Sequence, residues 1–416
     1  MLLSERLSSL NSSITLEVDA LGKKLKSEGK LVISFGAGEL DFAPPEAALT
    51  SAKAAVDDVA SNRYSSSAGL SSLRAKIAQK VNRIQQLHGT VAEVSEEQVV
   101  VTNGGKQAVF EILAAVLNPG DEIILLGPSW LTYYEVAEYH GAKVVNIPGD
   151  AQNNYKVTPD ELQSAISSKT KAIIINSPCN PTGAVYAADE LYAIGEVLLN
   201  TDVWVISDEI YESLIYGELA SQRETAPHIL EVLPELAEQT ILVNGVSKSY
   251  AMTGWRVGYL IAPGWVAAQI LKLQGHLSSN VNNIAQKAAL AALETPSDHF
   301  AKMRKILEER RDLIVSLLEQ IRIGSSSSRG VSFNIPDGAF YVIVNVEKLL
   351  NTPLSHEKLV ADDTTSLVKL LLKKTLVAVV PMDSFGIKNH IRFSYALSKE
   401  DIREGITRII DFLGEE

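Results

Sequence analysis

Short apolar runs alternate with helical patterns between about residues 95 and 260, and this alternation restricts the fold more than any other feature of the sequence. Strands that are apolar on both sides belong in a sheet that helices cover on both faces, as in mainly parallel α/β proteins. Ligands bind such sheets at the carboxyl ends of the strands. We therefore expect an α/β fold with its functional site at the ends of the runs "QVVVT" (98–102), "EIILL" (122–126), "AKVVNI" (142–147), "KAIIIN" (171–176), "VWVIS" (203–207), "TILVNG" (240–245) and "VGYLIA" (257–262).

After about residue 290 the chain changes to a different mixture of elements. "HFAKMRKILEERRDLIVSLLEQI" (299–321) has the spacing of a long, charged amphipathic helix. "VSFNIPDGAFYVIVNV" (331–346) predicts two strands around a Pro/Gly turn. The serine-rich "GSSSSRG" (324–330) could link two domains or form a loop inside the smaller one, which we favour. Because 416 residues exceed one ordinary domain, we expect a separate α+β unit here.

Composition and charge exclude several classes of protein. Hydrophobic residues make up 46% and charged residues 21%, as in globular proteins. The net charge of −12 argues against a nucleic-acid surface, which needs clustered Lys and Arg. Cys179 is the single cysteine, so no intramolecular disulfide can form and a reducing compartment is favoured. With no apolar run near the ~20 residues of a membrane span and no apolar segment typical of a signal peptide in "MLLSERLSSL", we expect a cytoplasmic protein without membrane contacts.

Polar residues stand where several of these strands end, and each also has a purely structural interpretation. Asp208 in "SDEIYESL" could cap a turn, or it could be a buried anion that needs a cation such as a protonated pyridine nitrogen. Tyr211 could reach the same ligand. Asn180 in "NSPCNPTG" could present its amide to an anionic oxygen or belong only to a rigid loop. "TNGGKQ" (102–107) could hold a phosphate at a helix N-terminus or only form a tight turn.

"SKSYAMTGWR" (247–256) places Lys248 just beyond another strand. Lys248 could be an ordinary surface charge, or a reactive amine whose surroundings lower its pKa. The polar residues at the ends of the other strands favour the second interpretation. Pyridoxal phosphate requires an amine for its aldehyde, an acid for its ring nitrogen and a cradle for its phosphate, and these segments offer all three.

Nine segments in this order resemble the class I aminotransferases, pyridoxal-phosphate enzymes of fold type I, and most closely the bacterial-type aspartate aminotransferases. The likeness covers about residues 10–412 and rests on "GAGELDF", "RYSSSAGLSSLR", "TNGGKQ", "GPSWLTYYE", "NSPCNPTG", "SDEIY", "VNGVSKSYAMTGWRVGY", "PDGAFY" and "HIRFSYA". It implies a large domain at 49–290 with a mainly parallel seven-stranded sheet between helices. It also implies a small α+β domain formed by 1–48 and 291–416.

The resemblance further implies roles toward pyridoxal 5'-phosphate. Lys248 would bond the aldehyde and act as the catalytic base that moves the α-proton. Asp208 would hold the proton of the ring nitrogen, and Trp130 would stack on the ring. The ring hydroxyl would be bound by Asn180 and Tyr211, and the phosphate by Gly104, Gly105, Lys106, Ser247 and Arg256. Tyr64 would reach the phosphate of a neighbouring subunit, so the resemblance implies a homodimer with shared active sites. No metal is implied.

Substrate recognition is also inferred from the resemblance. Arg392 would bind the substrate α-carboxylate as a bidentate fork, with help from the backbone of Gly38. Trp130 and Asn180 would also contact the substrate. A second cation, Lys106, with the hydroxyls of Ser13 and Thr15, would favour aspartate and glutamate. Alternatively, Lys106 is an exposed first-turn lysine, and "SSIT" (12–15) is a helix cap.

The reaction implied is ping-pong transamination, most simply aspartate with 2-oxoglutarate to give oxaloacetate and glutamate. Aromatic amino acids, alanine or prephenate are alternative substrates, β- or γ-elimination is an alternative reaction, and a regulatory or binding protein on the same scaffold is a non-enzymatic alternative. The sequence departs from the family pattern at Gly245, Leu40 and Met382–Asp383. We expect Cys179 to fill space near the cofactor, with a redox role as the alternative.

Overall fold

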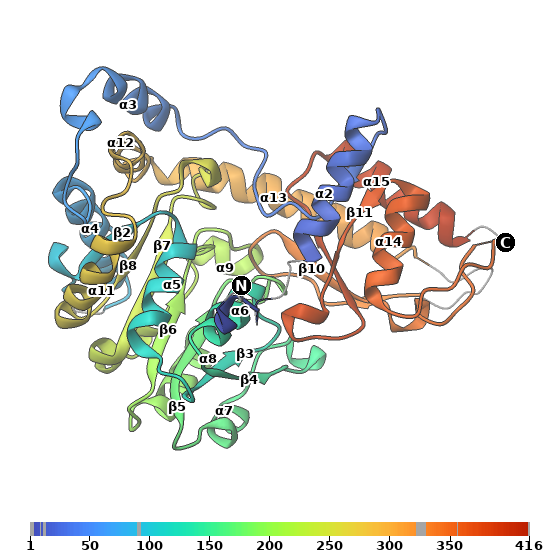
Figure 1. Cartoon of the computed structure of the whole chain (residues 1–416). Coiled ribbons are helices and arrows are strands. Elements are labelled where there is room, and N and C mark those ends of the chain that lie inside the picture. Colours follow the sequence, from blue (N-terminus) through green and yellow to red (C-terminus); the bar gives the residue numbers. More distant parts are fainter. Residues whose placement is uncertain are drawn as a thin grey trace.

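A seven-stranded sheet forms the centre of the larger part of the molecule (Figure 1). The computed structural model describes residues 4–8, 10, 14–89, 93–321, 330–355 and 357–414. The strand order is β2-β8-β7-β6-β5-β3-β4, and β8 runs antiparallel to both neighbours while the other pairs are parallel. Each strand begins and ends within one or two residues of its predicted run: β2 (Val99–Thr102), β3 (Glu122–Leu126), β4 (Lys143–Ile147), β5 (Thr170–Asn176), β6 (Trp204–Asp208), β7 (Thr240–Gly245) and β8 (Gly258–Ile261).

Helices cover both faces of this sheet, because successive strand side chains point to opposite faces. In β5, Ile174 packs toward one set of helices, and Ile173 and Ile175 toward the other. The first face is covered by α5 (Gly105–Val116), α6 (Leu131–Tyr139) and α11 (Gly264–Leu277). The second face is covered by α3 (Glu46–Asp57), α4 (Ser71–Leu87), α7 (Pro159–Ala165), α8 (Ala188–Leu198), α10 (Ile229–Val232) and α12 (Asn283–Ala292).

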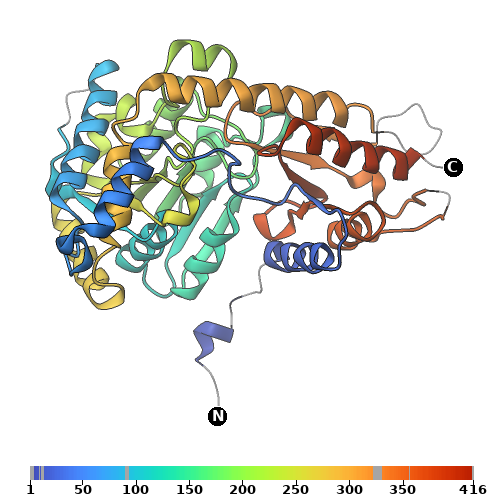
Figure 2. The ribbon, with the colours of Figure 1, turned by 90° about the horizontal axis from the view of Figure 1, so that it is seen from above.

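A smaller α+β part lies beside the first. Its strands form a four-stranded sheet in the order β12-β13-β10-β9 and a two-stranded sheet of β1 and β11. The strands are β1 (Ile33–Ser34), β9 (Ser332–Phe333), β10 (Tyr341–Asn345), β11 (Val377–Ala378), β12 (Val380–Pro381) and β13 (His390–Ser394). The helices are α2 (Ile14–Ser27), α14 (Thr364–Thr375) and α15 (Lys399–Gly414). The long helix α13 (Ser297–Leu318) extends from the larger part into the smaller one (Figure 2).

Residues from both ends of the chain share the core of this smaller part. Ile33 pairs in parallel with Val377, and Phe35 packs edge-on against Phe393 with ring centroids 5.4 Å apart. This mixing agrees with a small domain built from both chain ends, although the boundaries at 49–290 stay a prediction. The segment 324–330 lies outside the described residues except for Gly330.

Two short helices and several 3-10 turns complete the described chain. Helix α1 (Glu5–Ser8) lies against α6, and α9 (Gly217–Gln222) bonds to α13 through Gly217. The 3-10 turns are Val59–Asn62, Glu96–Gln98, Ala151–Asn153, Pro234–Gln239, Thr253–Trp255, Glu347–Leu349 and Asp383–Phe385. Over the described ranges, no helix is both long and apolar enough to cross a bilayer.

The contact between α15 and the N-terminal strand gives a test of this shared core. A Cβ added at Gly405 would lie 2.4 Å from the Phe35 ring, whereas one at Gly414 in the same helix would meet no atom within 4 Å. We expect Gly405→Ala to lower the free energy of unfolding by about 1–3 kcal/mol through overpacking. Gly414→Ala should change it by less than about 0.5 kcal/mol. Equal denaturant midpoints for the two variants would contradict the packing described here.

Candidate active site

A cavity of about 1010 Å³ lies at the carboxyl ends of the central strands. The parallel register places Asn176 of β5 opposite Asp208 of β6, and β7 leads into Lys248. The smaller part closes the cavity from the other side with Tyr341 and Arg392. The predicted position of the site, at the ends of these strands, is therefore the position of the cavity.

Asp208 is a buried carboxylate at the end of β6, with 4% of its surface exposed. The hydroxyl of Tyr133 donates to its Oδ2 at 2.6 Å, and the N–H of Ile210 donates to Oδ1 at 3.1 Å. Burial raises the pKa of Asp208, while these two hydrogen bonds and the charge of Lys248 act in the opposite direction. The donors thus stabilise the ionised carboxylate inside the cavity.

Lys248 projects into the same cavity. Its Nζ donates a hydrogen bond to the carbonyl oxygen of Gly38 and lies 5.7 Å from the ring centroid of Tyr211. Burial, followed by the charge of Arg392, lowers the pKa of Lys248 to about 8. A larger fraction of this amine is therefore unprotonated near neutral pH than for a solvated lysine.

The glycine turn before α5 packs directly against Arg256. Gly104 has φ +82°, and a Cβ added there would lie 2.4 Å from Arg256 Nη2. The guanidinium donates to the carbonyl oxygens of Thr253 at 2.9 Å and Asn103 at 3.3 Å. The first N–H groups of α5 and a guanidinium therefore face one place in the cavity, which is an arrangement that suits a phosphate.

Trp130 and Lys106 form the wall next to this turn. The Nζ of Lys106 lies 4.9 Å from the ring centroid of Trp130, and the ring of Tyr133 meets that of Trp130 edge-on at 5.4 Å. Burial, followed by the charge of Arg256, lowers the pKa of Lys106. Lys106 lines the cavity, although it lies in the first turn of α5 and its side chain is exposed, as the alternative interpretation expected.

Arg392 is a buried guanidinium without a carboxylate partner. Only 4% of its surface is exposed, and no Asp or Glu in the described part of the chain forms an ion pair with it. Its Nη1 donates to Asn180 Oδ1 at 2.8 Å, and its Nη2 donates to the carbonyl oxygen of Gly36 at 3.3 Å. Its Cζ lies 4.3 Å from the ring centroid of Tyr341. Because burying an unpaired charge is costly, this cation points to an anionic ligand.

The remaining predicted residues divide into those that line the cavity and those that do not. Ser247 and Tyr211 line it, and the Tyr211 hydroxyl shares a 3.0 Å hydrogen bond with that of Tyr341. Tyr64 is 92% exposed and does not reach this cavity. Ser13 lies outside the described residues; Thr15 lies in the first turn of α2, and its side chain is outside the described part.

The departures from the family pattern have physical explanations. Gly245 of β7 pairs with Gly258 of β8, and a Cβ there would lie 2.9 Å from Gly258 Cα, so the strands leave no room for a serine. Leu40 and Met382 are buried among apolar residues. Asp383 accepts a hydrogen bond from the hydroxyl of Thr364. These positions contribute to packing and do not add charge to the cavity.

Cys179 is buried beside the strand ends. Its Sγ lies 3.6 Å from the carbonyl oxygen of Pro128, and burial raises the pKa of the thiol. A thiol that is harder to ionise is less reactive, so the geometry favours the interpretation as a filler over a redox role.

Reasoning from the sequence missed two tyrosines of the cavity that contact predicted site residues. Tyr133 contacts Asp208, and Tyr341 joins Tyr211 to Arg392. Tyr133 lies three residues after Trp130, one helical turn away, which was an available signal. Nothing local to "GAFY" indicates the contact between Tyr341 and a residue 130 positions earlier.

Comparisons with known proteins identify the family. The sequence matches the family described as aminotransferase class I and II over residues 30–409. The chain belongs to this family. It is 42% identical over 412 residues to the aspartate aminotransferase of Streptomyces avermitilis, which covers 99% of this chain and 96% of that protein. It is 37% identical over 411 residues to the aspartate/prephenate aminotransferase of Cereibacter sphaeroides, with 99% and 98% covered.

Solved structures of aminotransferases share the fold. The aspartate aminotransferase of Rhizobium meliloti superposes with a TM-score of 0.90 at 32% identity, with 99% of both chains covered. The enzyme of Thermus thermophilus with maleate gives a TM-score of 0.88 at 33% identity, with 99% and 100% covered. The predicted fold class, fold type I, and the predicted family are confirmed.

The charge environment of Lys248 in this aminotransferase can be measured directly. We expect the rate of Lys248 acetylation in cofactor-free protein to rise with a midpoint near pH 8, because the pKa of this amine is lowered to about 8. In Arg392→Met the midpoint should move upward by about half a pH unit or more, since a neighbouring cation is removed. Arg408→Met, which removes a distant guanidinium, is the control. A midpoint that stays unchanged in Arg392→Met would contradict the electrostatic coupling.

Proposed function

We propose that this chain is a pyridoxal 5'-phosphate-dependent aminotransferase that takes aspartate and 2-oxoglutarate and gives oxaloacetate and glutamate by a ping-pong mechanism. The observation that carries the proposal is the meeting of Lys248, Asp208 and Arg392 in one cavity. An amine with a lowered pKa, a buried carboxylate and a guanidinium without an ion pair are the groups that this chemistry needs.

The residues present fit the cofactor. The close approach of Gly104 to Arg256 leaves a backbone cradle beside a cation, and Asp208 lies inside the cavity with its carboxylate held by two donors. We propose that the phosphate is bound by Gly104, Gly105, Lys106, Ser247 and Arg256, and the ring by Asp208, Trp130, Asn180 and Tyr211. When bound, the cofactor supplies an electron sink for the bond that breaks at the substrate α-carbon.

The chain's own groups bind the substrate and move its proton. Arg392 offers two nitrogens to the α-carboxylate, and its plane is held by Asn180, Gly36 and the Tyr341 ring. Lys248, once its amine is free, accepts the α-proton and later returns a proton, for which a pKa near the working pH is favourable. Asp208 keeps a negative charge opposite this amine.

Preference for dicarboxylic substrates rests on a second cation in the cavity. Lys106 lies beside Trp130, at a different place from Arg392. A cation there attracts a side-chain carboxylate and leaves a neutral side chain without compensation. We propose that Ser13 and Thr15 add hydroxyls at this end. The relatives include both aspartate and aspartate/prephenate aminotransferases. Prephenate is therefore a further acceptor to test.

Assembly and location are also proposals. Tyr64 presents 92% of its surface outside the cavity of its own chain, which suits a residue that reaches a neighbouring subunit, so we propose a homodimer with shared active sites. The single cysteine, Cys179, supports a reducing compartment, and we propose a cytoplasmic location. The non-enzymatic alternative is disfavoured because Lys248 and Asp208 are both present and both lie in the cavity.

Mixing the purified yellow holoenzyme with single amino acids tests the function. We expect aspartate and glutamate to convert the absorption of the cofactor rapidly from its aldehyde form to its amine form, with slow or no change for alanine and phenylalanine. Lys248→Ala should fold with an unchanged circular dichroism spectrum and show no turnover. Wild-type turnover in Lys248→Ala, or no bound chromophore in the wild type, would refute the proposal.

The role of Lys106 gives a separate prediction on specificity. We expect Lys106→Met to lower kcat/KM for aspartate by roughly 10–100-fold, because a charge-assisted contact to the side-chain carboxylate is lost. The kcat/KM for alanine should change little, which makes alanine the internal control. An equal loss for both amino acids would mean that Lys106 serves the cofactor alone.

A further inference from the structure

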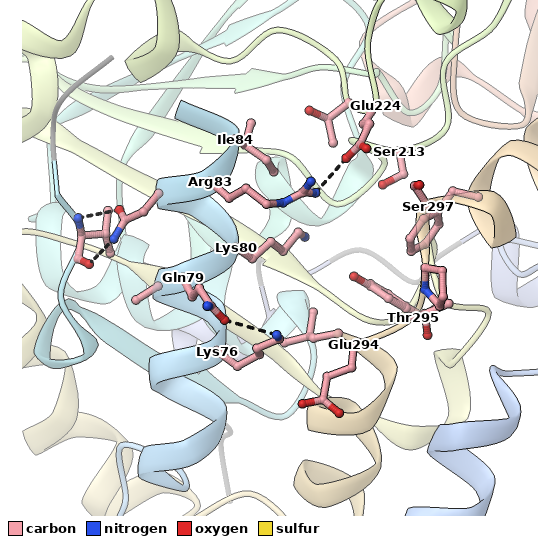
Figure 3. A pocket seen from close by; sticks show the side chains of 18 of the residues that line it. Lys76, Gln79, Lys80, Arg83, Ile84, Ser213, Glu224, Glu294, Thr295 and Ser297 are labelled. Atoms are coloured by element: carbon pink, nitrogen blue, oxygen red, sulfur yellow. Dashed lines mark hydrogen bonds and ion pairs between the residues drawn. The ribbon is translucent and has the colours of Figure 1, made fainter. Parts of the chain in front are cut away.

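A second cavity, of about 890 Å³, lies outside the candidate active site and shares no lining residue with it. Figure 3 shows it between α4, which carries Lys80 and Arg83, and the segment around Thr295 and Ser297 at the start of α13. Ser213 and Tyr250 line its inner wall. These two residues follow Tyr211 and Lys248 by two positions each, so this cavity lies behind the wall of the active site.

Three buried hydroxyl-bearing residues line this cavity. Ser213, Thr225 and Tyr250 are 6%, 6% and 4% exposed. None of the three hydroxyls bonds to another described residue, although each residue lines the cavity. None of the three is among the enclosed polar atoms that lack a partner in the described chain, so these hydroxyls are open to the cavity and available to bond a polar group there.

A guanidinium stands at the same cavity without an ion pair. Arg304 Nη1 donates to the carbonyl oxygens of Glu224 at 2.9 Å and Arg223 at 3.4 Å, and burial lowers the pKa of Arg304. Within the described ranges, no carboxylate lies within 4.0 Å of its nitrogens. Like Arg392, Arg304 is held in place by neutral partners at a cavity, but it is half-buried whereas Arg392 is buried.

Two carboxylates near Arg304 are paired with other cations. Glu224 forms an ion pair with Arg83 at 2.7 Å, drawn as a dashed line in Figure 3. Glu212, behind the inner wall, pairs with Lys80, whose Nζ also contacts the Tyr259 hydroxyl at 3.4 Å. Burial lowers the pKa of Arg304 and the charge of Glu224 raises it, but no ion pair forms between these two side chains, and several hydroxyls line the same cavity.

We propose that this cavity binds the carboxylate or phosphate group of a small anionic metabolite through Arg304 and the hydroxyls of Ser213, Thr225 and Tyr250. Hydroxyls and a guanidinium are the donors that such oxyanions accept, and charge-assisted bonds are the stronger ones. Glu96 and Glu294, which also line the cavity, disfavour ligands of high negative charge. The proposal is independent of the transamination proposed for the first cavity.

Calorimetric titration of the holoenzyme with inorganic phosphate, and separately with acetate, tests this site. We expect saturable binding of at least one probe at roughly millimolar concentration. Arg304→Met should weaken it by about tenfold or more, as expected when a charged hydrogen-bond donor is removed. The double variant Ser213→Ala/Thr225→Val keeps every charge and should weaken it by about threefold or more.

Arg408→Met is the matched control, because Arg408 also donates to a backbone carbonyl oxygen, that of Leu31, but lies on α15 outside the cavity. It should bind the probes as the wild type does, and Arg304→Met and Arg408→Met should transaminate at the wild-type rate without probe. A preference for phosphate indicates a phosphate ester, and a preference for acetate indicates a carboxylate. The proposal is overturned if neither probe binds, or if Arg304→Met and the hydroxyl variant both bind as tightly as the wild type.

Discussion

The parallel pairing of β5, β6 and β7 is the constraint on which the rest of the structure depends. Their register sets Asn176, Asp208 and Val243 side by side at one edge of the sheet. Residues more than 60 positions apart in sequence are thereby held at fixed separations by backbone hydrogen bonds. Helices on both faces remove the strands from water, so the edge at the carboxyl ends is where polar side chains can converge.

The cavity at this edge concentrates positive charge inside an acidic protein. Lys248, Lys106, Arg256 and Arg392 all line it, while the chain as a whole carries a net charge of −12. Arg392 contributes to the lowered pKa of Lys248, and Arg256 to that of Lys106. Arg392 is the buried one of the four, and an anionic ligand bound to it would offset the cost of burying its charge.

Much of the fold could be predicted from the sequence because its signals are local. The runs of Val and Ile located all seven strands of the large sheet, and glycines and prolines marked their ends. The Lys248, Asp208 and Arg392 positions came from motifs whose spacing is distinctive. The hydrogen-bond partners of these residues were harder to predict. The bond from Tyr133 to Asp208, for example, joins residues 75 positions apart and depends on how α6 packs. The inner wall of the second cavity had no sequence signal, since its hydroxyls come from separate loops.

The stretch from the end of β6 to Ser213 contributes side chains to both cavities. Asp208 and Tyr211 face the first cavity, Ser213 faces the second, and Glu212 is tied to Lys80 of α4. One short stretch of backbone thus separates the two cavities and lines both of them. Free-energy changes caused by substitutions on its two sides should therefore not be additive, since residues that share backbone and partners are coupled. Redesign of the substrate range of this protein therefore has to vary this stretch as a whole and not one side chain at a time.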